Sequence, residues 1–224
     1  MLQNGSIKIR HSQHAIIKYM KKYLTIILTA MTALVSMACS GTSKANEVTN
    51  KESSNMKAIV IYFSHAGENY SVGNIKEGNT KLVADMICEL AGADRFEIVA
   101  EKSYDMAYAP LCDLAKEEQQ NGELPAFKGG IDNIDDYDTI FIGGPIWWGT
   151  YPQVMFTFFS KYDLNGKTII PFTTHEGSGM GSVVSDLKKA YPKATFKEAL
   201  SIYGHDVCTS GRKSVECWLK KLGM

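Results

Sequence analysis

The sequence lacks the short motifs by which many proteins bind nucleotides, exchange thiols or hold metals. It contains no Gly-Lys-Ser/Thr of a P-loop. None of its five cysteines forms a Cys-x-x-Cys pair, the usual spacing of a thiol-redox centre. No run of Cys, His and carboxylate residues has the spacing of a metal site. These absences argue against P-loop chemistry, thiol exchange and a resident metal.

Charge is unevenly distributed along the 224 residues. The first 39 residues hold no acidic side chain and five of the 24 basic ones, which leaves 19 basic against 24 acidic residues, a net charge of −5, in the rest. Binding to nucleic acid needs a basic face that neutralises phosphates. We therefore expect no nucleic-acid partner.

The N-terminal segment has the layout of an export signal. Lys21-Lys22 precedes the uncharged stretch 23–38, and Cys39 follows directly. A basic region, a short apolar region and small residues before a cysteine indicate a bacterial lipoprotein signal. We expect residues 1–38 to be the signal segment, with lipid attached at Cys39 and the protein facing the periplasm or the cell exterior. Secretion without a lipid and a single transmembrane anchor are the alternatives.

Met20 is the natural start of such a signal, so that residues 1–19 would be a mis-called start. Residues 39–55 are mostly Ser, Thr, Asn, Lys and Glu, and they predict a flexible tether because they cannot bury enough apolar surface to order themselves. The folded domain is then expected at 56–224, with the membrane reached only through the N-terminal lipid.

The domain alternates between predicted strands and predicted helices. A continuously apolar, β-branched run indicates a strand buried on both faces at 57–63, and partial alternation indicates a short strand at 95–100. Further strands are predicted at 137–143, 167–172 and 199–203. Apolar residues at helical spacing predict helices around 82–90, 111–120, 152–159, 183–187 and 215–222. This order predicts an α/β fold, a three-layer doubly wound parallel sheet of five strands.

The loop after the first strand has the composition of an anion site. Ser64, Gly78, Asn79 and Thr80 lead into the start of the first helix. Hydroxyl groups and free backbone N–H groups at a helix N-terminus bind anions without any basic side chain. The alternative is that Asn79 or Thr80 is a plain helix cap.

The loops after the third and fourth strands suit a flat ligand. Residues 143–149 place two adjacent tryptophans after a buried strand, and 174–181 is rich in glycine, which lets a ligand approach the backbone closely. Taken singly, the tryptophans could be core or interface aromatics and the glycine loop an ordinary connection. Because the carboxyl ends of parallel strands share one edge, we expect all three loops to converge there.

These motifs together resemble the flavodoxin-like family, over about residues 57–222. The stretches that carry the resemblance are Tyr62-Phe-Ser-His65, Glu77-Gly-Asn-Thr80, Gly144-Pro-Ile-Trp-Trp-Gly149 and Thr174-His-Glu-Gly-Ser-Gly179. The resemblance implies the strand order 2-1-3-4-5 and FMN as the cofactor. Residues 67–76 split the phosphate loop of the family, and they are a candidate flap tipped by Tyr70.

The resemblance also implies roles for single residues. Those expected around the FMN phosphate are Ser64, His65, Gly78, Asn79 and Thr80. Those expected along the isoalloxazine are Pro145, Ile146, Trp147, Trp148 and Gly149. Those expected on its other side are Thr174, His175, Gly177, Ser178 and Gly179. Independently of the resemblance, Tyr104 and Tyr108, which precede the second helix, are expected to pack a loop, with a place at the ligand edge as the alternative.

The expected function is electron transfer by an FMN-binding flavoprotein, to a redox partner protein or a small-molecule acceptor. Because the flavin carries the chemistry, no side chain is predicted as catalytic. One alternative is an FMN-dependent NAD(P)H reductase of a quinone or another small acceptor, which the missing Gly-x-Gly-x-x-Gly motif disfavours. The other is a tethered binding module that has the fold and no redox role.

Overall fold

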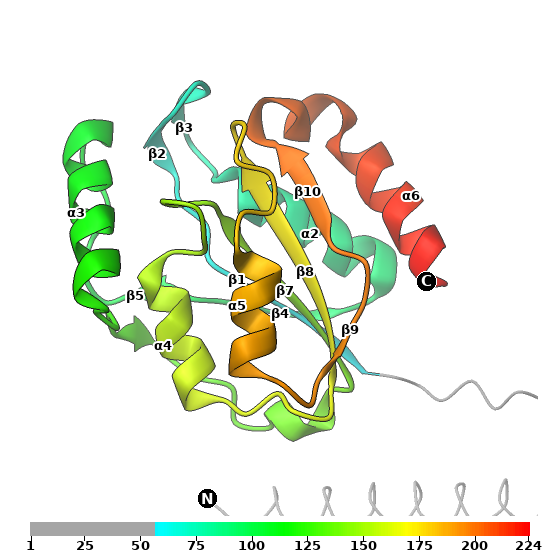
Figure 1. The fold of residues 1–224 in the computed structure, drawn as a ribbon. Helices are drawn as coiled ribbons and strands as arrows, with labels where there is room; N and C mark the ends of the chain where they lie inside the picture. Colours follow the sequence, from blue (N-terminus) through cyan, green and yellow to red (C-terminus); the bar gives the residue numbers. More distant parts are fainter. Residues whose placement is uncertain (1–56) are drawn as a thin grey trace, which may run out of the picture. The chain divides into compact units, whose positions relative to one another are not determined.

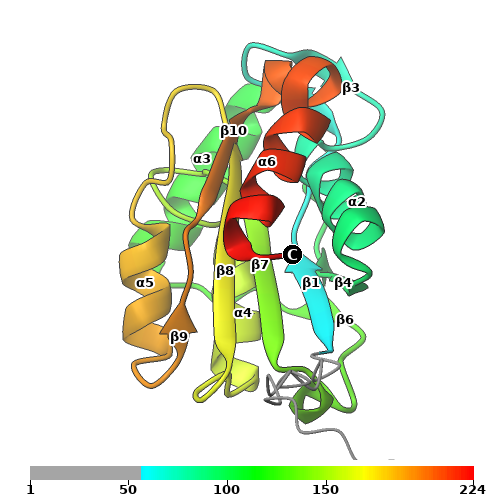
Figure 2. The ribbon, with the colours of Figure 1, turned by 90° about the vertical axis from the view of Figure 1, so that its right-hand side faces the viewer.

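The central sheet is parallel and lies between two layers of helices (Figures 1 and 2). The computed structural model describes residues 57–224, so the expected signal, Cys39 and the tether lie outside the described residues. The strands follow the spatial order β4 (Asp94–Glu97), β1 (Ala58–Tyr62), β7 (Thr139–Pro145), β8 (Thr168–His175) and β10 (Leu200–Tyr203). Counted along the chain, this is the predicted order 2-1-3-4-5, which is confirmed.

Each face of the sheet carries its own hydrophobic core, because successive strand side chains point to opposite faces. Ile59, Ile61 and Phe63 pack with one core, whereas Val60 and Tyr62 pack with the other. The first core is covered by α3 (Tyr108–Asn121), α4 (Gln153–Lys161) and α5 (Val183–Ala190). The second is covered by α2 (Asn79–Ala91) and α6 (Arg212–Leu222), as Figure 1 shows. Burial on both faces explains why the central strands β1, β7 and β8 are mostly apolar, whereas the edge strand β4 carries charged, exposed side chains.

The fifth strand is interrupted. A short piece, β9 (Thr195–Phe196), pairs with the start of β8, and β10 pairs with its end. Thr195 lies opposite Thr168 and Leu200 lies opposite Phe172, so that the second piece is shifted by one residue relative to the first. An extra residue of this kind is a bulge, which is common in edge strands. The end of β10 still lies beside the end of β8.

Two small antiparallel pairs were not predicted. The stretch 67–76 forms a hairpin of β2 (Gly67–Asn69) and β3 (Gly73–Ile75). Strand β5 (Val99–Ala100) lies outside the main sheet and pairs with β6 (Phe127–Lys128). These strands have two or three residues each, too short for a hydrophobic period to show in the sequence.

The remaining helical turns are short. They are η1 (Ile134–Asp136), η2 (Gly204–Asp206) and the π-helical η3 (Val207–Gly211), which leads directly into α6. The last helical region therefore begins before the predicted 215. Among the described residues, no helix is both long and apolar enough to cross a membrane.

Gly143 is required by the packing between β7 and β8. A Cβ atom at this position would lie 1.9 Å from Cζ of Phe172, a fully buried ring on the neighbouring strand. Gly143→Ala should therefore destabilise the fold by about 1–3 kcal/mol or more, the usual range for an overpacked core. Urea denaturation followed by circular dichroism measures this loss.

The matched control is Gly211→Ala. Its added Cβ would meet atoms no nearer than 3.7 Å, and its φ of −55° is helical. This substitution should be neutral, or stabilising by up to about 1 kcal/mol, because alanine favours helix over glycine. Equal unfolding midpoints for the two variants would contradict the packing argument.

Candidate functional site

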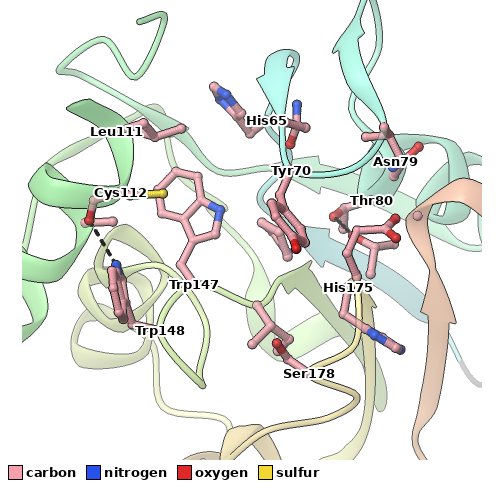
Figure 3. Close-up of a pocket in the computed structure, with 18 of the residues that line it drawn as sticks. His65, Tyr70, Asn79, Thr80, Leu111, Cys112, Trp147, Trp148, His175 and Ser178 are labelled. Carbon is pink, nitrogen blue, oxygen red and sulfur yellow. Dashed lines mark hydrogen bonds between the residues drawn. The ribbon is translucent and has the colours of Figure 1, made fainter. Parts of the chain in front are cut away.

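A cavity of about 580 Å³ opens at the carboxyl ends of β1, β7 and β8 (Figure 3). All three predicted loops reach it. The predicted residues that line it are His65, Asn79, Thr80, Pro145, Ile146, Trp147, Trp148, Gly149, Thr174, His175 and Ser178. Four predicted residues are not among its lining: Ser64, Gly78, Gly177 and Gly179. The convergence of the loops on one edge is thus found as expected.

Ser64 and Gly78 do not line the cavity, but they position the start of α2, which does. The Ser64 Oγ accepts the Lys81 backbone N–H at 3.0 Å, so the inserted hairpin does not separate Ser64 from the helix. A Cβ on Gly78 would lie 2.2 Å from Ser64 Oγ and 2.5 Å from the His65 carbonyl oxygen. Only glycine permits this close approach of the loop to the start of α2.

The helix end of the cavity offers N–H and hydroxyl groups and no lysine or arginine. The first backbone N–H groups of a helix have no partner within the helix, and they carry its positive dipole end. The Thr80 Oγ1 lies 2.7 Å from Thr174 Oγ1, which ties this end to β8. Lys81 pairs instead with Glu77 and Asp85 on the outer side of α2. An anion would therefore be held here by hydrogen bonds and the helix dipole.

Trp147 forms the aromatic wall of the cavity. Its ring centroid lies 5.5 Å from that of Phe63, 5.3 Å from that of Tyr104 and 5.8 Å from that of His65. All three rings meet the indole at 74–85°, so none stacks parallel on it. Such edge contacts fix the orientation of the indole and leave it able to take a parallel partner.

Trp148 is fixed to the neighbouring helix. Its Nε1–H donates to the Cys112 carbonyl oxygen at 2.9 Å, and its own carbonyl oxygen accepts from Gln119. Its φ of +51° is rare for a residue other than glycine. The two tryptophans therefore point apart, and Trp148 fastens the loop to α3 while half of its surface stays exposed.

The third loop is tied to the second through glycine. The Ser182 N–H donates to the Gly149 carbonyl oxygen at 2.8 Å, and a Cβ on Gly181 would lie 2.1 Å from that same oxygen. Gly177 and Gly179 have φ values of +119° and +61°, so they shape the loop without lining the cavity. The second and third loops are therefore in direct contact through their main chains.

The pKa values of two histidines beside this loop are shifted in opposite directions. His175 lines the cavity, and its Nδ1 accepts the Gly177 N–H at 2.9 Å, which places its proton on Nε2. Burial lowers the pKa of His175 below 6.5. The hydrogen bond from His205 Nδ1 to the Glu176 carboxylate, 2.7 Å long, raises the pKa of His205 above 6.5. Glu176 also accepts the His205 backbone N–H and so links the loop to η2.

Sequence reasoning missed a group of lining residues on the inserted hairpin, on α3 and beyond β8. They are Asn69, Tyr70, Val72, Tyr108, Leu111, Cys112, Ala115, Glu176 and Gly204. Tyr70 was noted only as the tip of a candidate flap. Tyr104 packs as expected, with its hydroxyl on the buried Glu118 carboxylate, whereas Tyr108 lines the cavity. Side chains from α3 could not be placed because no spacing rule brings that helix to this edge.

Comparisons with known proteins agree with this arrangement. The family model described as Flavodoxin matches residues 57–222. A candidate flavoprotein of known structure from Bacteroides eggerthii DSM 20697 is 29% identical and covers 76% of this chain and 99% of its own, with a TM-score of 0.61. Another, from Bacteroides uniformis ATCC 8492, is 27% identical over 74% of this chain and 98% of its own, with a TM-score of 0.61. The comparison with curated proteins gave no match.

The chain therefore belongs to the flavodoxin family, and FMN is its cofactor. The residues of the cavity fit this group. A helix N-terminus with hydroxyls suits the phosphate, and the Trp147 wall suits a flat conjugated ring. The His65 Nε2 is buried and has no hydrogen-bond partner within residues 57–224, so a polar atom of a ligand can satisfy it.

The link between Glu176 and His205 predicts a difference between the two histidines in titration. In a histidine NMR titration, His205 should have a pKa above 6.5 and His175 one below it. A raised pKa in the folded state means that the link stabilises the fold fully below pH 6.5 and that this contribution is lost as pH rises through the folded pKa. Glu176→Gln should bring the His205 pKa down towards 6.5.

Glu89→Gln is the matched control, since Glu89 pairs with Arg212 on the surface. It should leave both histidine titrations unchanged. An unaltered His205 pKa in Glu176→Gln would contradict the assigned pairing.

Proposed function

We propose that this protein transfers electrons by means of bound FMN, to a redox partner protein or a small acceptor. One observation carries the proposal: a single cavity without lysine or arginine in its lining joins a helix N-terminus to an aromatic wall at the carboxyl edge of a parallel sheet. When bound, FMN supplies the redox chemistry. The protein supplies the binding groups, the orientation of the ring and the exclusion of water.

The roles of the residues follow from their positions. Thr80 and the first N–H groups of α2 hold the phosphate, and Trp147 contacts the ring system. His175 presents an Nε2–H at the cavity because its Nδ1 is occupied by the Gly177 N–H. His65 offers a second nitrogen beside Trp147. These histidines, one on each side of the cavity, would hydrogen-bond polar atoms of the ring.

The proposal includes an exported protein held to a membrane by lipid at Cys39, on the evidence of the N-terminal signal pattern. The partner would then be met outside the cytoplasm. Large apolar side chains stay exposed at this edge, on the hairpin, on the second loop and at the end of β10. Exposed aromatic groups around a redox centre suit contact with a partner protein. The acidic body makes nucleic acid an unsuitable partner.

The phosphate assignment predicts that the protein prefers FMN to riboflavin, which lacks the phosphate. Thr80→Val should weaken FMN binding roughly 10-fold or more, the range for losing a hydrogen bond to a charged group. It should leave riboflavin binding nearly unchanged. Quenching of flavin fluorescence in a titration measures both affinities.

Riboflavin is the internal control, because any general damage to the cavity would weaken both ligands alike. Equal losses for FMN and riboflavin would refute the phosphate site. If wild-type protein shows no saturable quenching with FMN, the redox proposal fails and the non-redox binding module gains support.

The carrier and reductase alternatives differ in their electron donor. Reduced holoprotein mixed with oxidised cytochrome c should reduce the haem faster than free FMN does at the same concentration, because the protein presents the flavin to partners. NADPH without oxygen should leave the flavin absorption of the wild-type holoprotein unchanged over minutes. Rapid bleaching by NADPH together with turnover of a quinone would instead establish the reductase.

A further inference from the structure

We propose that the β2–β3 hairpin supplies a second aromatic wall, Tyr70, which covers the flavin ring from the side away from Trp147. Tyr70 then decides which donors and acceptors reach the face of the ring. This inference rests on the proposed function, since it assumes that a flat ring occupies the cavity.

The position of the hairpin carries the first part of the argument. Asn69, Tyr70 and Val72 all line the cavity, although the hairpin lies outside the main sheet. Figure 3 shows Tyr70 between Trp147 on one side and Thr80 and His175 on the other. The third loop, which closes the cavity from β8, contributes no large aromatic ring of its own. Tyr70 is therefore placed where that loop leaves the ring uncovered.

Tyr70 is exposed in a way that a packing residue is not. It retains 62% of its surface although it lines a cavity. Exposed apolar surface at the mouth of a cavity gains free energy when a ligand covers it. The next residue, Ser71, has a φ of +65°, an uncommon conformation that sets the turn at the tip. The hairpin thus holds Tyr70 at the cavity without burying it.

The hairpin is fastened to α3 by a charged hydrogen bond. The Glu68 carboxylate accepts the Tyr108 backbone N–H at 2.8 Å, at the first residue of α3. The residue before it, Ala107, offers no side-chain cap, so Glu68 takes that role from outside the helix. The Tyr70 ring also lies 5.9 Å from the Tyr108 ring. Since a two-stranded hairpin is marginal alone, these contacts determine its position.

Covering the ring face has a chemical consequence. For hydride transfer, the nicotinamide of NAD(P)H must stack on the flavin. It then passes a hydride, which is one proton with two electrons, to the flavin and becomes NAD(P)+. Single electrons can pass through the exposed edge of the ring without such stacking. With Trp147 on one side and Tyr70 on the other, the site is selective for electron exchange at the edge.

Hydrogen exchange of the wild-type protein tests the contact directly. Binding of FMN should slow amide exchange across 67–75, and riboflavin should do the same because the contact is made to the ring. If FMN binds with saturable quenching and exchange in 67–75 does not change, the inference is overturned while the proposed function stands. If FMN does not bind at all, the proposed function itself has failed.

Variants test the role of the side chain. Tyr70→Ala should weaken FMN binding roughly 3- to 10-fold, as expected for the loss of one aromatic contact. It should also let NADPH bleach the flavin of the saturated holoprotein faster than in the wild type. Tyr70→Phe keeps the ring and should behave as the wild type in both measurements.

Variants of Glu68 test the contact that holds the hairpin on α3, and a variant of Leu124 is the control on a surface outside the cavity. Glu68→Ala should act in the same direction as Tyr70→Ala, whereas Glu68→Gln keeps an acceptor oxygen and should have a smaller effect. Leu124→Ala removes another exposed apolar side chain, outside the cavity, and should change nothing. If Tyr70→Ala retains wild-type FMN affinity and resistance to NADPH, Tyr70 does not cover the ring.

Discussion

The site depends on two glycines, Gly78 and Gly181, at which two segments of main chain lie in direct contact. At the first, Gly78 lets the start of α2 approach the Ser64–His65 loop within the space that a Cβ would fill. At the second, Gly181 lies against the Gly149 carbonyl oxygen and joins the second and third loops. No other residue fits either position, because any side chain would overlap the neighbouring main chain. Without these contacts the three loops would not enclose one cavity.

The two ends of the cavity are suited to a ligand through different interactions, polar at one end and aromatic at the other. The helix end gathers hydroxyl and N–H groups and keeps basic side chains outside, so an anion is held by hydrogen bonds and the helix dipole. The aromatic end holds Trp147 by edge contacts with Phe63, which directly follows β1, and with Tyr104 in the stretch before α3. Trp148, which also lines the cavity, fastens the same loop to α3 through its indole N–H. Trp147 and Trp148, although adjacent in the sequence, thus have different roles.

The hairpin and α3 extend the site beyond the parallel sheet. Glu68 caps α3 and holds the hairpin, while Tyr70 and Tyr108 bring their rings to the cavity mouth. Glu118, buried on α3, accepts the Tyr104 hydroxyl, and Tyr104 in turn contacts Trp147. A carboxylate on an outer helix therefore helps to orient the aromatic wall. In this way α3 supports both sides of the ring position that we propose.

The sequence by itself determined the parallel sheet and the edge at which the loops meet, and its resemblance to the flavodoxin-like family implied the strand order. Runs such as 58–63 and 140–142 are apolar and rich in β-branched or aromatic residues, which is typical of strands that are buried on both faces. Parallel order then brings the loops with Ser64, Trp147 and His175 together, since all of them follow strand ends.

Only the tertiary structure decided which residues line the cavity and which support it. Ser64, Gly78, Gly177 and Gly179 lie in the predicted loops, yet they shape the backbone behind the wall. Tyr70, Tyr108 and Glu176 reach the cavity through contacts between segments far apart in the chain. Such contacts have no period or spacing in the sequence, because they depend on how a hairpin and a helix dock on the completed sheet.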